Sequence, residues 1–283
     1  MTDLHRGMPD QQWLGQNVVE RVIEDFRYLH PKTGPWDLIL FTGDLTNRGN
    51  QAQFTEADAL LTRLRTWIAD HQGGRQPILL AVPGNHDLQR PPDDDEGLGY
   101  LKGWAAAKQK TLWEKPDSVV RNTISSAFSD YSTWWARQVA IGEQQPNGIV
   151  DYREGLLPGD FSATIVNGLG CRLGILGLNT AFLQLTGADY ERRLALHARQ
   201  FHAACGGDGP AWASEHNACL LLTHHPAEWL DADSQQHLEG EITDHGRFAL
   251  HLCGHLHEPR GGLTALNFTQ PKLVFQGRSL FGW

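Results

Sequence analysis

The sequence contains few cysteines, and none of them lies in a pattern that binds zinc or forms a redox pair. Only four occur in 283 residues, and they are far apart along the chain: Cys171, Cys205, Cys219 and Cys253. Three of them adjoin segments that we predict to be strands. We therefore expect buried free thiols in a reducing compartment and not a disulfide framework.

The sequence also lacks any apolar run of the ~20 residues that a helix needs to span a bilayer. The N-terminus has neither the basic nor the apolar region of a signal peptide. We expect a cytoplasmic protein without a membrane partner.

Basic residues are in the minority. Lys and Arg number 24 against 33 Asp and Glu, which gives a formal net charge of −9. This balance argues against broad electrostatic binding of nucleic acid, although a metal cluster or a local basic rim can still admit a phosphodiester.

No linker, composition shift, internal repeat or low-complexity segment divides the chain. A chain of 283 residues with 40% hydrophobic residues is long enough for one large core. We expect a single domain over residues 1–283, with an insertion at about 88–160.

Apolar runs alternate with amphipathic segments along most of the chain. Helical spacing of apolar residues predicts helices over 12–29, 55–69 and 191–205. Short apolar runs predict strands over 36–41, 78–82, 161–167, 171–179, 218–223 and 248–253, with closing strands in 263–275. Strands and helices in this order are typical of a layered α/β fold.

The alternation stops between about residues 88 and 160. An acidic loop at 91–96 precedes two predicted helices at 100–113 and 118–139, which carry four tryptophans. Because the stretch follows polar residues at a strand end, we predict that it caps a site there. We expect the aromatic residues of this stretch to pack in the core, which is more common than a role as a platform on which bases stack.

The segment Gly84-Asn85-His86-Asp87 follows the apolar run 78–82. It places an amide, an imidazole and a carboxylate at the carboxyl edge of a sheet, where open α/β sheets build their sites. Alone it could be a turn, since Gly, Asn and Asp favour turns. Four further ends of strands or extended segments carry similar side chains: Asp3 with His5, Asp44, His224 with His225, and His255 with His257.

Together, these five ends predict a metal centre. A single histidine at the end of a strand is usually a structural residue, but five ends that all carry ligand-type side chains would be a large coincidence. Oxygen and imidazole donors without thiolates suit Mn(II), Fe or Zn.

The order of these motifs resembles the calcineurin-like metallophosphoesterase superfamily. The shared pattern is Asp-x-His, Gly-Asp-x-x-(Asp/Asn)-Arg-Gly, Gly-Asn-His-(Asp/Glu), a strand-terminal His and Gly-His-x-His, and it runs from Asp3 to His257. Asn47 stands where phosphoprotein phosphatases commonly have Asp, which moves the resemblance toward the bacterial phosphodiesterase and nuclease branches. The resemblance implies a four-layer α/β/β/α sandwich with two mixed sheets.

The resemblance also implies two divalent metal ions, with Mn(II) favoured and Fe or Zn as alternatives. The first ion would be held by Asp3, His5 and His257, the second by Asn85, His224 and His255, and Asp44 would bridge them. Of two adjacent histidines we choose His224, because family members place the ligand first after the strand; His225 is the alternative.

Two cations that share a carboxylate lower the pKa of a bridging water enough to supply a hydroxide nucleophile, and they neutralise charge on the phosphoryl oxygens. Asn85 adds a ligand oxygen without a further negative charge. His86 is placed to protonate the leaving oxygen, with Asp87 orienting it; the alternative is a purely supporting role. Arg48 resembles the family's phosphate-contacting arginine, or else it caps a helix or pairs on the surface.

Three functions follow as hypotheses. The first is a phosphodiesterase for nucleotide or nucleic-acid substrates, and the second is a phosphomonoesterase for a small molecule or a phosphoprotein. The third is an effector or regulatory module of a larger assembly, with a weakly active metal site and fused or associated domains. The third stays open because the chain starts on its first motif and ends without a polar tail, as an excised domain would.

Overall fold

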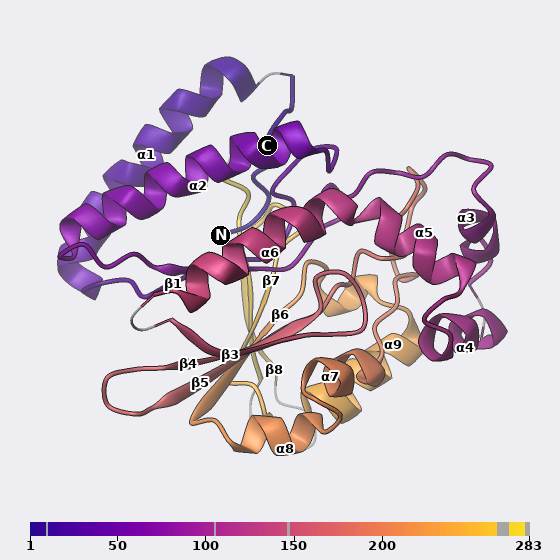
Figure 1. The fold of residues 1–283 in the computed structure, drawn as a ribbon. Helices are drawn as coiled ribbons and strands as arrows, with labels where there is room; N and C mark the ends of the chain where they lie inside the picture. The colour runs from indigo at the N-terminus through magenta and orange to yellow at the C-terminus, as the bar shows by residue number, and fades with distance from the viewer. Residues whose placement is uncertain (10, 105, 146–147, 265–271, 281–283) are drawn as a thin grey trace.

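The structure is a computed structural model that describes residues 1–9, 11–104, 106–145, 148–264 and 272–280. Two sheets lie between helices on both outer sides (Figure 1). Helices α1, α2 and α6 cover the smaller sheet, whereas α7, α8 and α9 lie on the other side, beyond the larger sheet. The predicted four-layer α/β sandwich is therefore confirmed.

The smaller sheet consists of β1 (Leu38–Phe41) and β2 (Ile78–Ala81). Among the described residues it contains only these two strands, which are parallel, so it is not the mixed sheet that we expected. Helices α1 (Gln11–Thr33) and α2 (Gln51–His71) precede and follow β1 in the chain. All four residues of β2 are buried, as its continuous apolar sequence predicts.

Residues 1–6 run in parallel beside the end of β1. The amino group of Met1 donates a hydrogen bond to the carbonyl oxygen of Leu40 (2.8 Å), and the amide of His5 donates one to that of Asp44 (2.9 Å). The N-terminal residues thus form a short hydrogen-bonded segment, not a regular strand. This segment brings Asp3 and His5 to the end of β1.

The insertion contains more helices than we predicted. Each of its two predicted helices is divided into two, which gives α3 (Glu96–Leu101), α4 (Ala106–Glu114), α5 (Val119–Ala127) and α6 (Ser129–Glu143). The first division lies at Lys102-Gly103, where glycine disfavours a continuous helix. The second lies at Phe128, whose buried side chain anchors the junction in the core.

Helix α6 belongs to the outer helical layer of the sandwich (Figure 1). Its Trp134 is fully buried and stacks on Phe54 of α2, with ring centroids 5.7 Å apart. Helices α3, α4 and α5 form a separate group at one end of the molecule.

The larger sheet has seven strands among the described residues, in the order β3-β4-β5-β6-β7-β9-β8. Strands β5, β6, β7 and β9 are parallel to one another, and the others pair antiparallel. The bounds are β3 (Ile149–Glu154), β4 (Phe161–Val166), β5 (Arg172–Gly177), β6 (Ala218–Leu222), β7 (Leu250–Cys253), β8 (Arg260–Thr264) and β9 (Lys272–Gln276). The predicted hairpin of β4 and β5 is confirmed, and part of the predicted closing segment, residues 265–271, lies outside the described residues.

Strand β3 was not predicted. A bulge between Ile149 and Asp151 interrupts its pairing with β4, so its sequence lacks the regular alternation that marks a half-buried strand.

The prediction of one helix over residues 191–205 was wrong in its first half. Helix α7 covers only Ala198–Ala204. Before it, Leu194 forms an isolated bridge with Leu230, and three consecutive residues, 194–196, are buried. Three consecutive buried residues do not fit an amphipathic helix, because such a helix exposes one of its faces.

The remaining helices are short. They are α8 (Gly209–Ser214), α9 (Ala232–His237), the 3₁₀ turns η1 (Ala227–Trp229) and η3 (Asp244–Gly246), and the π-helical turn η2 (Leu238–Ile242).

The four cysteines are free thiols. Cys205, Cys219 and Cys253 are buried as expected, but Cys171 is exposed because it lies in the turn before β5. Among the described residues, no helix combines the length and the apolar composition that crossing a membrane requires.

Candidate metal centre

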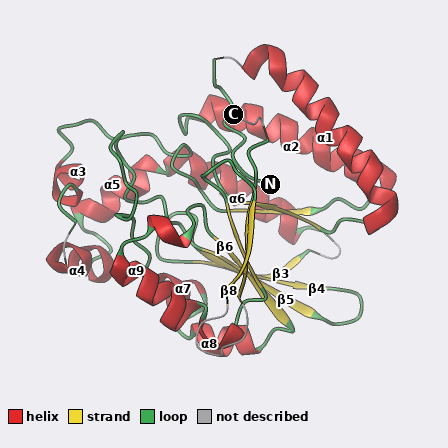
Figure 2. Cartoon of the chain, turned by 180° about the vertical axis from the view of Figure 1, so that it is seen from behind, coloured by secondary structure: helices red, strands yellow, loops and turns green. Residues whose placement is uncertain are grey.

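The predicted metal ligands lie in loops at one edge of the two sheets. Asp44 and Asn85 follow the neighbouring strands β1 and β2, whereas His255 and His257 follow β7 of the larger sheet. Figure 2 shows these loops gathered around the N-terminus, at one end of the strands. The structure therefore brings together side chains from both ends of the sequence.

The backbone at this edge is unusual. Five of the predicted ligands have a positive φ: Asp3 (53°), His5 (47°), Asp44 (57°), His255 (74°) and His257 (58°). Among the other non-glycine residues that the structure describes, only Arg192 shares this conformation. Each such residue costs of the order of 1–3 kcal/mol and persists only where its surroundings impose it, as they do at functional sites.

Two glycines allow the loops to approach one another. A Cβ at Gly43, where φ is +95°, would lie 2.4 Å from Nδ1 of His224. A Cβ at Gly84 would lie 2.1 Å from Oδ1 of Asp44. Both positions therefore require glycine for the ligand loops to meet.

The first group of donors consists of Asp3, His5 and His257. Nε2 of His257 lies 3.4 Å from Oδ1 of Asp3 and 3.1 Å from Nε2 of His5. Nε2 of His5 lies 3.8 Å from the same oxygen of Asp3. Two imidazole nitrogens and a carboxylate oxygen thus point at one small volume.

The second group consists of Asn85, His224 and His255. Nε2 of His224 lies 3.1 Å from Oδ1 of Asn85, and the rings of His224 and His255 have centroids 5.2 Å apart. Nδ1 of His224 lies 2.8 Å from the carbonyl oxygen of Thr42. That contact directs Nε2 of His224 towards the other donors.

Asp44 lies between the two groups. Its Oδ2 is 3.6 Å from Nε2 of His5 in the first group and 3.4 Å from Nε2 of His224 in the second. Its Oδ1 accepts a hydrogen bond from the amide of His86 (2.8 Å). One carboxylate oxygen therefore faces both groups.

The charges at this edge are strongly coupled. Burial opposes a charge on Asp44, yet His224 and then His5 outweigh it and hold the pKa of that carboxyl well below its usual value. Burial likewise opposes a charge on His224, but Asp44 raises the pKa of this imidazole to about 9. Burial, followed by His224, lowers the pKa of His255 to about 3, so His255 is a neutral ring with a lone pair.

The donor set fits divalent cations. Oδ1 of Asp3 is buried and accepts no hydrogen bond from any residue that the structure describes, while Oδ2 accepts hydrogen bonds from the hydroxyl of Thr2 (2.6 Å) and the amide of His255 (3.2 Å). A buried carboxylate oxygen that lacks a hydrogen-bond donor and faces two imidazole nitrogens suits a cation between them. Nitrogen and oxygen donors without thiolates are those that Mn, Fe and Zn accept.

His225, the alternative to His224, is held on both sides of its ring. Its Nδ1 lies 3.0 Å from the hydroxyl of Thr180, and its Nε2 lies 2.9 Å from Oε1 of Gln184. Burial lowers the pKa of His225 well below its usual value, so it is neutral. These contacts occupy both ring nitrogens of His225, although His225 also offers an atom within 4.8 Å of His224 and His255.

His86 and Asp87 have separate surroundings. Nδ1 of His86 lies 3.0 Å from the carbonyl oxygen of Asn47, and its ring stands edge-on to that of His5, with centroids 4.7 Å apart. His86, His5 and Asp44 offer atoms within 4.8 Å of one another.

Asp87 does not orient His86, contrary to our prediction. Its buried carboxylate accepts hydrogen bonds from the amides of Leu45 (3.2 Å), Thr46 (2.8 Å) and Gly84 (3.0 Å). Asp87 therefore joins the loop after β1 to the loop after β2. The carbonyl oxygen of Asn47 orients His86 instead.

Arg48 is exposed and lines a cavity of about 580 Å³ beside the metal edge. Asn85 and His86 line the same cavity. The cavity that Arg48 lines is therefore next to Asn85, a predicted metal ligand, and His86, the predicted proton donor.

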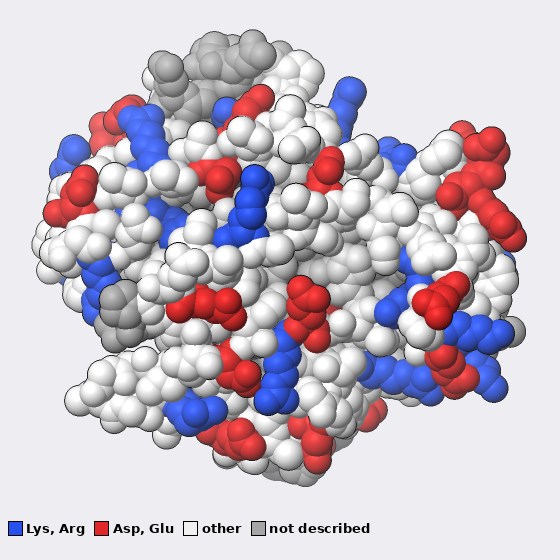
Figure 3. Space-filling view, viewed as in Figure 1, with Lys and Arg blue, Asp and Glu red and all other residues white. Residues whose placement is uncertain are grey.

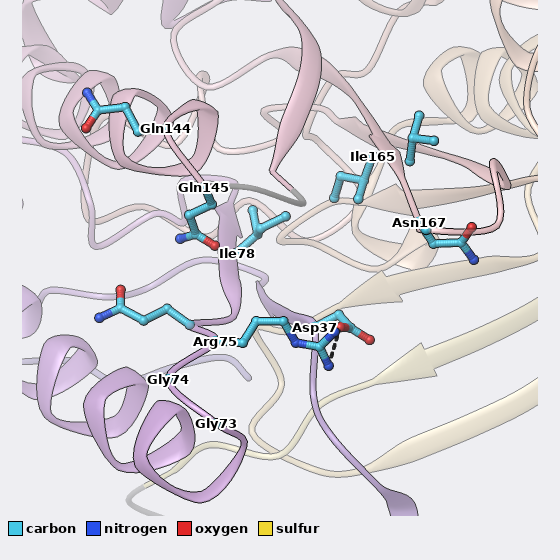
Figure 4. A pocket seen from close by; sticks show the side chains of 12 residues that line it. Asp37, Gly73, Gly74, Arg75, Ile78, Gln144, Gln145, Ile165 and Asn167 are labelled. Atoms are coloured by element: carbon cyan, nitrogen blue, oxygen red, sulfur yellow. Dashed lines mark ion pairs between the residues drawn. The ribbon is translucent and has the colours of Figure 1, made fainter.

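A second cavity, of about 530 Å³, lies at the opposite edge of the sheets (Figure 4). Asp37 precedes β1 and Ile78 begins β2, so this cavity adjoins the amino ends of strands whose carboxyl ends carry the donors. Its polar wall includes the ion pair of Arg75 with Asp37 (3.1 Å). It is separate from the candidate metal centre.

Two supporting contacts were not predicted from the sequence. The carbonyl oxygen of Thr42 positions His224, and a backbone carbonyl has no signature in a sequence. The hydroxyl of Thr180 positions His225. Because Thr180 comes directly after the predicted strand 171–179, its position at a strand end is a signal that could have identified it from the sequence.

Comparison with known proteins gives a clear family match. The sequence matches the profile of the calcineurin-like phosphoesterases over residues 1–259. A search of curated protein sequences found no match.

The chain is also similar to solved structures at low identity. A sulfate thiohydrolase, SoxB, of Thermus thermophilus is 16% identical with a TM-score of 0.43, and the match covers 93% of this chain but only 38% of that protein. A phosphopantetheinyl hydrolase of Mycobacterium tuberculosis is 14% identical with a TM-score of 0.41, covering 99% and 88%. A dimetal phosphatase of Danio rerio is 10% identical with a TM-score of 0.43, covering 100% and 87%.

The family uses a dinuclear centre of divalent metals, and the two donor groups around Asp44 provide candidate ligands for one. With its profile matched over 1–259 of 283 residues, the chain belongs to the calcineurin-like phosphoesterase family, whose members are metal-dependent phosphoric ester hydrolases.

Proposed function

We propose that the protein is a dinuclear-metal phosphodiesterase for nucleotide or nucleic-acid substrates, with Mn(II) as its metal. The observation that carries the proposal is the position of Oδ2 of Asp44, 3.6 Å from His5 and 3.4 Å from His224. A carboxylate oxygen that faces two donor groups is the arrangement that a shared ligand of two cations needs.

The residues have distinct roles in this proposal. When bound, two divalent cations would activate a water molecule and neutralise charge on the phosphoryl oxygens. One would be held by Asp3, His5 and His257, the other by Asn85, His224 and His255, with Asp44 shared.

His86 would give a proton to the leaving oxygen from Nε2, because Nδ1 lies against the carbonyl oxygen of Asn47. Arg48 would bind a non-bridging phosphoryl oxygen from the wall of the cavity.

One feature supports a diester. A diester needs room for two organic groups, and the cavity of about 580 Å³ opens beside His86. His86 is half-buried at this cavity with a ring nitrogen that could protonate the leaving alcohol of either ester class.

On the face shown in Figure 3, basic and acidic side chains are interspersed and no large area carries a single sign. A long nucleic acid needs a continuous basic track, and this face carries none.

The test compares hydrolysis of bis-p-nitrophenyl phosphate with that of p-nitrophenyl phosphate, with Mn(II) added and Asp44→Ala as the inactive control. We expect kcat/KM to be at least tenfold higher for the diester. A preference for the monoester would favour a phosphomonoesterase. No turnover of either compound by protein with two bound metals would favour a regulatory module.

A second comparison addresses the substrate class. We expect hydrolysis of dinucleotides or single-stranded DNA. If the protein cleaves only cyclic nucleotides, a nuclease activity is contradicted. The proposal would then be limited to nucleotide substrates.

We further propose that the protein acts in the cytoplasm, which the three buried unbridged thiols support. We also propose that the insertion at 88–160 limits access to the metal edge within a single domain through its first part, since α6 and β3 at its end belong to the sandwich. Its first residues support this, because Leu88, Gln89 and Arg90 line the cavity beside His86.

A further inference from the structure

The cavity beside His86 has a wall that suits an anion. Its lining contains two arginines and no acidic residue, although the chain has a net charge of −9. The lining residues are Asn47, Arg48, Asn50, Asn85, His86, Leu88, Gln89 and Arg90. One of the arginines, Arg48, already has a place next to the reacting phosphate in the proposed function, whereas Arg90 has none.

The side chain of Arg90 lies close to another loop. Arg90 comes from the segment after β2, yet a methyl group at Gly187, after β5, would lie 3.2 Å from Nη1 of Arg90. Arg90 is exposed and forms no ion pair with any carboxylate that the structure describes. Its guanidinium therefore lies at the wall of the cavity without an anionic partner.

Other polar groups of the wall already have partners. Oε1 of Gln53 accepts hydrogen bonds from the amides of Asn47 (3.2 Å) and Arg48 (2.7 Å). The side chain of Asn50 accepts one from the amide of Gln53 (3.0 Å), and the amide nitrogen of the Gln89 side chain donates to Asp130. The two guanidinium groups are the permanently charged donors of the wall.

A guanidinium presents a planar pair of donors that matches a phosphate. Because Arg48 contacts the reacting phosphate in the proposed function, the guanidinium of Arg90 is left for a further anionic group. We propose that Arg90 binds a second phosphate group of the substrate, so that the preferred substrates are phosphodiesters of nucleotides that carry an additional phosphate monoester. This inference rests on the proposed function and names the substrate class of the same site.

The test measures binding without turnover. Adenosine 3′,5′-bisphosphate, adenosine 5′-monophosphate and adenosine 3′-monophosphate are titrated by calorimetry into Mn(II)-loaded protein, and the ligands are checked by chromatography afterwards. The proteins are the wild type, Arg90→Ala and Arg137→Ala. Arg137 is an exposed arginine on α6 that does not line the cavity and serves as the matched control.

We expect the wild type to bind the bisphosphate at least tenfold more tightly than either monophosphate. Arg90→Ala should remove most of this advantage and change the affinity for the better-bound monophosphate less than threefold, while Arg137→Ala changes neither. The inference is overturned if the wild type shows no advantage for the bisphosphate, or if the advantage persists in Arg90→Ala.

The outcome is distinguishable from a failure of the proposed function. Protein that binds the bisphosphate through Arg90 but hydrolyses no diester supports this inference and contradicts the phosphodiesterase. Protein that hydrolyses diesters and shows no preference dependent on Arg90 contradicts this inference alone.

Discussion

Two adjacent residues after β2 have different tasks. Asp87 joins the loops that carry Asp44 and Asn85 through three backbone amides, whereas His86 keeps a ring nitrogen for the cavity. In the proposed function, Asp87 would fix the position of a ligand and His86 would act on the substrate. Substitution of His86 should separate catalysis from metal binding.

We predict that His86→Ala lowers kcat for a diester by roughly 10² to 10⁴, the usual effect of a lost general acid. The metal content should stay at the wild-type value, because the seven other donors remain. Steady-state kinetics and elemental analysis of the same sample check this. The control is His202→Ala on α7, which should leave both values unchanged; loss of metal from His86→Ala would instead make His86 a ligand.

We expect metal binding to depend on the glycine at position 84 as well as on Asp44, the ligand that it faces. A methyl group there would lie 2.1 Å from Oδ1 of Asp44, so Gly84→Ala must displace the shared carboxylate. We predict at least a tenfold loss of Mn(II) affinity, measured by calorimetry, with an unchanged circular dichroism spectrum.

The matched control is Gly99→Ala in α3, where no atom lies within 4 Å of the added methyl group. This exchange should keep the metal affinity and leave stability equal or higher by up to about 1 kcal/mol, since alanine favours a helix. Equal metal affinities in the two variants would show that the position of Asp44 does not govern binding.

At the scale of secondary structure, helix α6 joins the insertion to the core. Trp134 on α6 is fully buried and stacks on Phe54, and Tyr131 on the same helix donates a hydrogen bond to the carbonyl oxygen of Ala81 (2.9 Å). Because Ala81 ends β2, α6 supports the strand that leads to the metal edge. The last helix of the insertion is therefore part of the fold.

We predict that Trp134→Ala lowers the free energy of unfolding by about 3–5 kcal/mol, the range for removing a large aromatic side chain from a core. Denaturation in urea measures the change. Val150→Ala on β3 is the control, because Val150 is 59% exposed and its removal should cost less than about 0.5 kcal/mol. A small effect of Trp134→Ala would mean that α6 is dispensable.

At the scale of the whole molecule, the sequence predicted the architecture and the place of the site. Asp44, Asn85, His224 and His255 follow short apolar runs, and a buried parallel strand is recognisable from such a run, whereas Asp3 and His5 were found from the motif alone. The same reasoning failed in two places. It predicted a helix around Leu194, where consecutive buried residues mimic an apolar helical face, and it missed β3, where a bulge at Ile149 breaks the alternation of apolar and polar residues.

The sequence could not predict which partner each polar side chain contacts. The carbonyl oxygen of Asn47 orients His86, and the amides of Leu45 and Thr46 hold Asp87, although about 40 residues separate these partners in the chain. Adjacency in sequence suggested that Asp87 orients His86. Only the packing of the two loops shows the actual pairs.

Stability of the molecule should decrease in acid because of His251 on β7. Burial lowers the pKa of His251 to about 4, whereas an unfolded chain has its usual value near 6.5. Between these pH values the unfolded state binds a proton that the native state does not. The contribution to stability is therefore complete above about pH 6.5 and is lost as the pH falls towards 4.

We predict that the difference in free energy of unfolding between the wild type and His251→Gln falls by about 3 kcal/mol from pH 7.5 to pH 4.5, at about 1.4 kcal/mol per pH unit. Urea denaturation at several pH values measures it. His71→Gln, at an exposed position on α2, is the control and should give a constant difference. A constant difference for His251→Gln would contradict a buried neutral imidazole.

The account depends most on two cations held on either side of Asp44. Anomalous diffraction at the manganese edge, from crystals grown with Mn(II), tests this directly. The account predicts two peaks per chain, one beside Asp3, His5 and His257 and the other beside Asn85, His224 and His255, with the carboxylate of Asp44 between them. A single peak, or none within reach of Asp44, would contradict it.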